Sequence, residues 1–576
     1  MTGLTAPEST RATPSFLGML FVLLASLQLL VYRDSFAAKP SNDDFIALHQ
    51  VDRGEKEGVG SFFMRSDVGD YRPLQNATFW LFGRWSRPHT LLSLRVLHFA
   101  SFAFYAVVAL LWVRALRFSR RSALVAMCVV FFHPTLAGAL AGFDNYSRLI
   151  VSAWVWLGAW VAHYHGSRPL LAVPLVSLCF AIGLGYMEYA IALIPLAVLG
   201  TAWRVGLRRP HDAGVMFVSL VGICIAYFMI RVSGMVATTS GTGYLSLNPL
   251  VWARNGVMIL VSVLFFGNTV PIMLQESLPN LAWLGSNVTL VGLTLGYGLW
   301  ADQRRSLLPA WADPHAISQA VRLPRLPLGF LGAAFGATFF PMLLMTHISE
   351  IYLTTVTLGL ALLAGGSADG WKTASRPLRR VVLLFAGTQV LLAANAIQGK
   401  VAGINDAGDR ADAMIQQLLS HLPDDGAARR AAIVFLQKEV EGRRGYSVFA
   451  MPDDQLVLPG YGTFAMQWFR PHQDVRLDQF VVGNVSDVDL ESYDLVLLWD
   501  GSTKRLMPMA RSTSRPRSSR RTPKEGPRSA FSRVASDFLQ RRPERRGDAS
   551  TIEVRRRPEG VLHEPLPERR VPLEAA

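Results

Sequence analysis

The chain has 576 residues, a formal net charge of +15 and a mean hydropathy of +0.27. Hydrophobic residues make up 51% of it, which is above the usual content of a soluble domain. They gather in segments about as long as a bilayer is thick. The composition therefore excludes an ordinary soluble domain and predicts an α-helical polytopic membrane protein.

The apolar segments give the predicted helices in chain order. They are residues 16–32, 91–113, 122–140, 148–164, 170–186, 187–203, 214–231, 255–273, 281–300, 327–346, 351–366 and 381–398. We expect the first to be retained as a helix, because no convincing signal-peptide cleavage site follows it. The 3 cysteines all lie inside apolar segments, and their spacing predicts neither a disulfide nor a zinc site.

Clusters of Arg and Lys predict the topology, because basic residues favour the cytoplasmic side. They lie at 114–121, 204–209, 304–325 and 372–380. With the N-terminus inside, residues 33–90 form a first external loop. The later clusters stay inside only if one of the segments 255–273 and 281–300 fails to cross, and the former is the weaker span. This arrangement has 11 crossings, and 12 crossings with the C-terminus inside is the alternative.

The character of the chain changes after residue 399. Residues 405–421 have the pattern of an amphipathic helix, and the apolar runs 431–436 and 494–499 are typical of buried strands. We therefore predict a transmembrane module over 1–399 and a small extramembrane α/β domain over 400–510. The basic tail, 511–576, is rich in Ser, Pro and Arg, so we expect it to be disordered and not to bind nucleic acid.

Two adjacent acids, Asp43 and Asp44, lie in the first external loop. A carboxylate at a membrane surface can accept a proton from an acceptor hydroxyl. A neighbouring carboxylate can tune its pKa or help to bind a divalent cation. For an isolated pair of acids, a solvated acidic turn would be the preferred interpretation. The surrounding motifs therefore decide whether this pair is interpreted as functional.

Those motifs follow one another over residues 40–360. They are Asn42-Asp43-Asp44-Phe45, Tyr71-Arg72-Pro73-Leu74-Gln75-Asn76, Phe82-Gly83, His98, Phe132-His133-Pro134, Asn145-Tyr146-Ser147-Arg148, Tyr186-Met187-Glu188-Tyr189-Ala190 and Ser349-Glu350-Ile351-Tyr352-Leu353. In this order they resemble the GT-C superfamily of membrane glycosyltransferases, in particular the protein O-mannosyltransferase type. The chain departs from that pattern at Met187, where the family has Lys, and at Ile351, where it has Arg.

The resemblance implies an inverting transfer of a sugar from a polyprenyl-phosphate donor to a hydroxyl acceptor. Asp43 or Asp44 would be the general base, and Arg72 and Arg148 would bind the phosphate, since guanidinium pairs well with phosphate oxygens. The remaining candidate substrate-binding residues are Asn76, His98, Asp144, Glu188, His347 and Glu350.

Several of these candidates also have a structural interpretation. Glu188 can form a structural ion pair, His98 can be a packed and hydrogen-bonded histidine, and Arg72 can anchor the loop to lipid headgroups. Asp144 and Glu350 can cap helices.

The resemblance also sets the expected surroundings. The enzyme would lie in a bacterial inner or plasma membrane, with its active site on the periplasmic or extracellular side. Mannose is the family's sugar, but another hexose or a pentose fits equally well, and the acceptor is a protein, lipid or polysaccharide. The resemblance implies no particular cofactor, and metal dependence stays open because the acid pair suits a divalent cation.

Two other functions compete with this one. An O-antigen polymerase or ligase also has many helices and a large external loop, but that loop comes late in the chain. A lipid-linked sugar transporter or flippase needs polar residues at mid-bilayer and often an inverted repeat. The sequence has no evident repeat, and its acids cluster toward one face.

Overall fold

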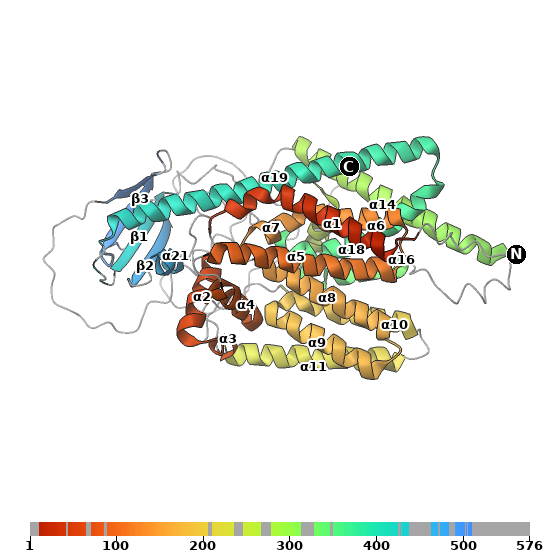
Figure 1. Cartoon of the computed structure of the whole chain (residues 1–576), viewed down its shortest axis with the longest axis horizontal. Helices are drawn as coiled ribbons and strands as arrows, with labels where there is room; N and C mark the ends of the chain where they lie inside the picture. Colours follow the sequence, from red (N-terminus) through yellow and green to blue (C-terminus); the bar gives the residue numbers. More distant parts are fainter. Residues whose placement is uncertain are drawn as a thin grey trace, which may run out of the picture. The chain divides into compact units, whose positions relative to one another are not determined.

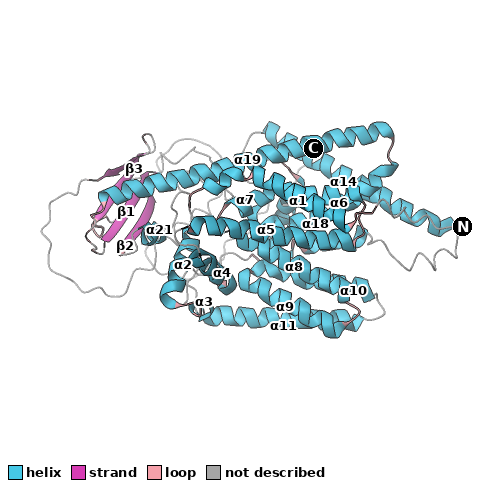
Figure 2. Ribbon diagram, in the orientation of Figure 1, coloured by secondary structure: helices cyan, strands magenta, loops and turns pink. Residues whose placement is uncertain are grey.

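The fold is mostly helical, with one small sheet (Figures 1 and 2). A computed structural model describes residues 11–41, 44–64, 71–85, 89–143, 145–205, 210–234, 246–266, 278–312, 328–345, 350–423, 425, 427, 429–436, 462–469, 473–482, 490–500, 503 and 505–509.

Most of the long helices follow the apolar segments of the sequence. The α-helices are α1 (Pro14–Val31), α2 (Asp44–Glu57), α3 (Ser61–Met64), α4 (Pro73–Trp85), α5 (Thr90–Ala115), α6 (Arg120–Phe132), α7 (Ala137–Ala141), α8 (Tyr146–His165), α9 (Pro169–Tyr186), α10 (Leu193–Val205), α11 (Pro210–Gly234), α12 (Pro249–Leu264), α14 (Leu278–Ala312), α16 (Leu328–Ala337), α17 (Phe340–Leu343), α18 (Thr354–Gly370), α19 (Arg376–His421) and α21 (Gly462–Phe469). Short 3₁₀ helices are η2 (Arg33–Ala37), η3 (Pro134–Leu136), η4 (Glu188–Ala192), η6 (Glu350–Leu353) and η7 (Trp371–Thr373).

Six of the described helices are long and apolar enough to cross a membrane, fewer than the 11 or 12 predicted crossings. They begin at Pro14, Thr90, Arg120, Pro169, Pro210 and Arg376. Some other predicted spans are divided: 187–203 becomes η4 and α10, and 327–346 becomes α16 and α17. The segment expected to be the weaker span gives the short helix α12, which ends at Leu264. These helices are compatible with a polytopic membrane protein.

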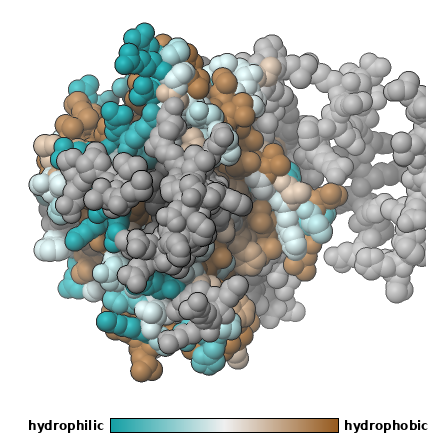
Figure 3. Space-filling view, turned by 90° about the vertical axis from the view of Figure 1, so that its right-hand side faces the viewer, coloured by the Kyte–Doolittle hydropathy of each residue, from teal (hydrophilic) through white to brown (hydrophobic). Residues whose placement is uncertain are grey.

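Several of these helices lie side by side. The pairs α5–α8, α8–α9 and α9–α11 are in contact, and the same order is visible in Figure 1. Trp112 and Trp156 are buried between them, and each indole N–H donates to a backbone carbonyl. Large apolar side chains on α1, α11 and α19 are exposed, and hydrophobic residues also reach the surface in Figure 3. Exposed apolar faces of this kind suit contact with lipid.

The segment 33–90 is largely helical, although the sequence interpretation treated it as a loop. It contains η2, α2, α3 and α4. Helices α2 and α4 pack closely: a Cβ added at Gly54 would lie 2.3 Å from the Trp80 ring, and one added at Gly83 would lie 2.4 Å from Val51. Small residues thus let the two helices approach, and Phe45 on α2 shares a core with Leu94 in α5 and Tyr146 at the start of α8.

The C-terminal sheet has the strand order β2-β1-β3-β4. Its strands are β1 (Arg429–Leu436), β2 (Val475–Val482), β3 (Leu495–Asp500) and β4 (Arg505–Pro508). β1 pairs in parallel with β2 and β3, and β4 is antiparallel to β3. The two strands predicted from the sequence are confirmed as β1 and β3. The described strands of this region therefore form a small mixed sheet, with parallel and antiparallel pairs.

Helix α19 leads directly into this sheet. It runs without a break from Arg376 to His421, so the domain boundary predicted between residues 399 and 400 falls inside one helix. Met414 and Leu418 on α19 share a core with Ile433 and Phe435 on β1 and with Phe45 on α2. The described sheet and the acid-bearing helix α2 therefore belong to one packed core. The tail 511–576 lies outside the described residues.

Candidate functional site

Asp44 is the first residue of α2, and both of its carboxylate oxygens accept backbone hydrogen bonds. One accepts from the Ser41 N–H at 3.0 Å and the other from the Phe143 N–H at 2.7 Å. The residue is only 5% exposed. Asp44 therefore connects the start of α2 to the turn between α7 and α8, and its partner in the acid pair, Asp43, lies outside the described residues.

A buried arginine supports the same turn. Arg95 on α5 is 1% exposed, donates a hydrogen bond to the Ala141 carbonyl and lies 3.7 Å from the centre of the Phe143 ring. The Asp44 carboxylate interacts favourably with its charge. Burial of a guanidinium is costly without a nearby anion. Arg95 contacts this turn at the Ala141 carbonyl and Asp44 contacts it at the Phe143 N–H, so both side chains hold the turn before α8.

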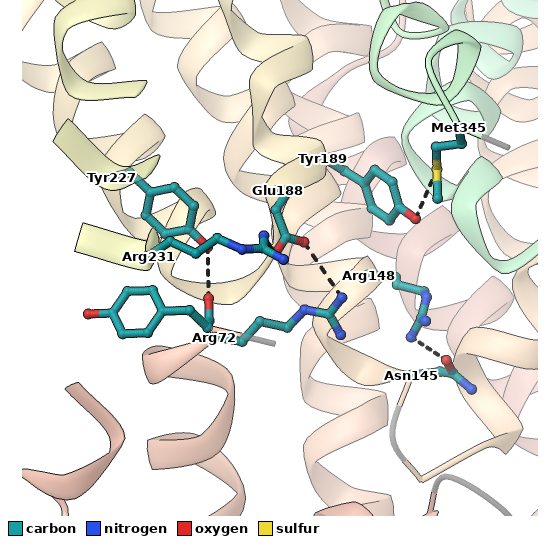
Figure 4. A network of polar contacts seen from close by, with 9 residues as sticks. Arg72, Asn145, Arg148, Glu188, Tyr189, Tyr227, Arg231 and Met345 are labelled. Atoms are coloured by element: carbon teal, nitrogen blue, oxygen red, sulfur yellow. Dashed lines mark hydrogen bonds and ion pairs between the residues drawn. The ribbon is translucent and has the colours of Figure 1, made fainter. Parts of the chain in front are cut away.

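A second polar cluster centres on Glu188, the first residue of η4. Arg72, just before α4, has its Nη2 3.6 Å from Glu188 Oε2. Arg231, in the last turn of α11, forms a direct ion pair with the other oxygen. The three side chains are 23%, 22% and 17% exposed (Arg72, Glu188 and Arg231, respectively). Figure 4 shows the two arginines reaching Glu188 from different elements.

Arg148 lies beside this cluster, on the side of Tyr189 (Figure 4). Arg148 belongs to the first turn of α8 and donates a hydrogen bond to the Asn145 side chain. Its guanidinium lies 5.6 Å from the centre of the Tyr352 ring. The rings of Tyr352 and Tyr189 are 5.0 Å apart. Tyr189 therefore lies between the ion pairs of Glu188 and the ring of Tyr352 that Arg148 faces.

The named residues of this cluster carry more positive than negative charge. Two guanidinium groups, those of Arg72 and Arg231, pair with the Glu188 carboxylate, and that of Arg148 lies nearby beside Tyr352. Guanidinium groups suit phosphate oxygens because they offer paired N–H donors in a planar fork. The arrangement can therefore bind an anion, and a phosphate group matches it chemically.

The other predicted residues have different surroundings. His98 is fully buried: its Nδ1 lies 2.6 Å from the Leu94 carbonyl oxygen, and its ring packs on Phe143 and Tyr146. This geometry fits the packed histidine of the structural interpretation. Asn76 is half-buried in the first turn of α4, where its N–H donates to the Arg72 carbonyl.

Three predicted residues cannot be placed with these clusters. Asp144 and His347 lie outside the described residues, and Glu350 begins η6 without a described side chain. Among the residues that the structure describes, no group of three or more His, Cys, Asp or Glu side chains could hold a metal ion. The described part of the acid pair, Asp44, is already engaged by two backbone N–H groups.

The sequence interpretation missed Arg231 and Arg95. Arg231 stands at the end of a predicted span, where a snorkelling side chain would be expected. Arg95 lies in the predicted span 91–113, three residues before His98. A charged residue inside an apolar helix was the available signal for Arg95, since such residues usually need a partner, whereas Arg231 at the end of its span gave no such signal.

The site is thus formed by two adjoining groups: Asp44 with Arg95 at the turn before α8, and Glu188 with its arginines beside Tyr189. The first group holds backbone segments in place, and the second brings two guanidinium groups to one carboxylate. No protein-family model matches the chain, and no curated protein sequence is significantly similar to it.

Proposed function

We propose that the protein is an integral-membrane glycosyltransferase of the GT-C type, which moves a sugar from a polyprenyl-phosphate donor to a hydroxyl acceptor at the outer face of the membrane. The observation that supports the proposal is the meeting of Arg72 and Arg231 at Glu188, with Arg148 nearby, since an anionic leaving group needs cationic partners. The sequence predicts Arg72 and Glu188 as substrate-binding residues, and their side chains lie 3.6 Å apart.

In the proposed reaction, the acceptor oxygen attacks the anomeric carbon of the donor sugar while the bond from that carbon to the phosphate oxygen breaks. The acceptor proton passes to a carboxylate acting as general base. Asp43 is the candidate for this role, because both oxygens of Asp44 accept hydrogen bonds from backbone N–H groups. Asp44 would then hold the first external segment in position for its neighbour.

The leaving group is a lipid phosphate, and its negative charge rises as the sugar departs. Arg72, Arg148 and Arg231 would stabilise that charge. A preorganised cation acts most strongly where water is partly excluded, and the side chains of Arg72 and Arg231 are about three-quarters buried or more. The lipid tail would lie in the bilayer next to the helices.

The test is sugar transfer in membranes that contain the full-length protein, a radiolabelled polyprenyl-phosphate sugar and a mixture of acceptors. The wild-type protein should form a labelled product, and Asp43→Asn should form none while still being expressed and inserted. The proposal is wrong if Asp43→Asn transfers sugar at the wild-type rate. Movement of the labelled lipid across the bilayer without any product would instead identify a transporter.

A further inference from the structure

Helix α19 meets the first external segment just ahead of the acid pair. The Asn405 side chain donates to the Asp34 carbonyl at 3.0 Å. The Lys39 ammonium lies 3.2 Å from Asp409 and 2.8 Å from Asp412. The α19 residues are separated by three or four positions, so they occupy one face of the helix. This face of α19 therefore holds residues 34–39 by both backbone and side chain.

The closest approach in this contact is made at Gly408. A Cβ added there would lie 2.3 Å from the Lys39 carbonyl oxygen and 2.9 Å from its carbonyl carbon. Gly in a helix interior costs about 0.5–1 kcal/mol relative to Ala, so this position is unfavourable for the helix by itself. It does allow the backbone of residue 39 to lie directly against the helix.

The ion pairs of Lys39 orient its side chain toward α19. Hydrogen bonds to Asp412 and Asp409 raise the pKa of Lys39 above its usual value of 10.5. Because the pKa is raised by folding, the pairing contributes its full stabilisation at a pH below the pKa of Lys39 in the unfolded chain. That stabilisation is lost as the pH rises through the higher pKa of Lys39 in the folded protein. Lys39 is therefore charged and paired at neutral pH. Its side chain is 46% exposed, so the pair orients the segment more than it stabilises the protein.

Helix α19 also contacts the segment that leads to Phe143, whose N–H is one of the two hydrogen-bond donors to Asp44. Lys400 is 1% exposed, and its ammonium donates to the Pro134 carbonyl at 3.1 Å. Pro134 opens η3, and α7 follows it directly and also contacts α19. The chain then reaches Phe143, whose N–H binds Asp44. α19 thus contacts the segments on both sides of the hydrogen bond between Asp44 and Phe143.

We infer that α19 is a positioning support for the acid pair, and that Gly408 and Lys39 are positioning residues for the transfer reaction. Residues 34–41 lead directly to Asp43, and they are held at one end by α19 and at the other by Asp44. The continuity of α19 with the sheet makes the C-terminal domain part of this support. The catalytic consequence rests on the proposed function, whereas the support itself does not.

The first experiment compares Gly408→Ala with Gly399→Ala in the full-length protein in detergent. Both glycines lie in α19, but nothing lies within 4 Å of a Cβ added at Gly399. Hydrogen–deuterium exchange of residues 33–41 should become about tenfold faster in Gly408→Ala, because local protection is lost when the contact opens. It should be unchanged in Gly399→Ala. Equal exchange in the two variants would overturn the inference.

The second experiment measures sugar transfer, with Lys39→Ala as a variant that adds no bulk. Lys39→Ala and Gly408→Ala should lower kcat several-fold and leave the KM for the donor unchanged, because the arginines around Glu188 are untouched. Lys39→Arg should restore the rate, since it keeps the charge. A rise in donor KM with constant kcat would contradict a positioning role.

The two experiments separate the support from the chemistry. If exchange responds as expected but the wild-type protein transfers no sugar, the support stands and the proposed function fails. If wild-type transfer is normal and exchange of residues 33–41 does not respond to Gly408→Ala or Lys39→Ala, the support fails and the proposed function stands.

Discussion

The Asp44 carboxylate accepts a hydrogen bond from the Phe143 N–H at 2.7 Å, which joins the start of α2 to the turn before α8. Its other oxygen accepts from the Ser41 N–H, three residues earlier. A side-chain acceptor that reaches back in this way is half of a capping box. The two neighbouring acids are therefore not equivalent: Asp44 holds backbone, and Asp43 is the candidate base.

Replacement of Asp44 should affect stability as well as activity. Asp44→Ala leaves the Phe143 N–H without its acceptor and removes a favourable charge from the buried Arg95. Hydrogen bonds to charged groups contribute about 1.5–3 kcal/mol each, so we expect a loss of about 3 kcal/mol, measured as a lower midpoint of thermal unfolding in detergent. Asp43→Asn is the matched control and should keep the wild-type midpoint. Equal midpoints for Asp44→Ala and Asp43→Asn would contradict a structural role for Asp44.

Arg231 should contribute to donor binding, because it supplies a guanidinium on the far side of Glu188 from Arg72. Loss of one charge-assisted contact to phosphate costs about 1.5–3 kcal/mol. We therefore expect Arg231→Gln to lower kcat/KM for the polyprenyl-phosphate donor about ten- to hundredfold. Arg114→Gln, at the exposed end of α5, is the control and should not change it. Unchanged kinetics in Arg231→Gln would remove Arg231 from the proposed donor site.

Glu188 should be coupled energetically to Arg231. Glu188→Gln removes the carboxylate that keeps two guanidinium groups close together, so it should destabilise the protein by more than the loss of one exposed ion pair would. A double-mutant cycle with Arg231→Gln measures the coupling. We expect the double variant to be more stable than Glu188→Gln alone, because one of the repelling charges is gone. Strictly additive changes in thermal unfolding would mean that the two side chains do not interact.

Many of the helices could be predicted from the sequence because they coincide with long apolar segments, which are typical of helices that cross a bilayer. Strands β1 and β3 were equally evident, since their short apolar runs are bounded by polar residues. The helical content of residues 33–90 was not predicted. Helix α2 mixes charged residues with its apolar ones, and its buried side reflects contacts with α4 and with α21, which lies far away in the sequence.

The site was predicted only in part, for a physical reason. Ion pairs between helices have no fixed spacing, so Arg231 could not be connected to Glu188, which lies 43 positions earlier. Burial distinguishes Asp44 from an exposed acid, and burial depends on the fold. The spacing of Ser41 and Asp44 was a readable signal, however, because a Ser followed three residues later by an acid is typical of a helix N-terminus.

Close packing of α6 against α18 should be sensitive to a single methyl group. A Cβ added at Gly365 would lie 2.5 Å from the Phe118 ring and 2.9 Å from the Ser122 carbonyl oxygen. Overpacking of this kind costs about 1–3 kcal/mol, and small residues allow membrane helices to approach closely. We expect Gly365→Ala to lower the midpoint of thermal unfolding in detergent.

Gly222→Ala on α11 is the matched control, because nothing lies within 4 Å of a Cβ added there. It makes the same chemical change in a helix, so any effect of helix propensity is shared by the two variants. The difference in midpoint therefore reports the contact between α6 and α18 alone. If Gly365→Ala is as stable as Gly222→Ala, the two helices do not pack at this distance, and the position of Thr354 and Thr355 at the start of α18 against Ser152 on α8 would have to be reconsidered as well.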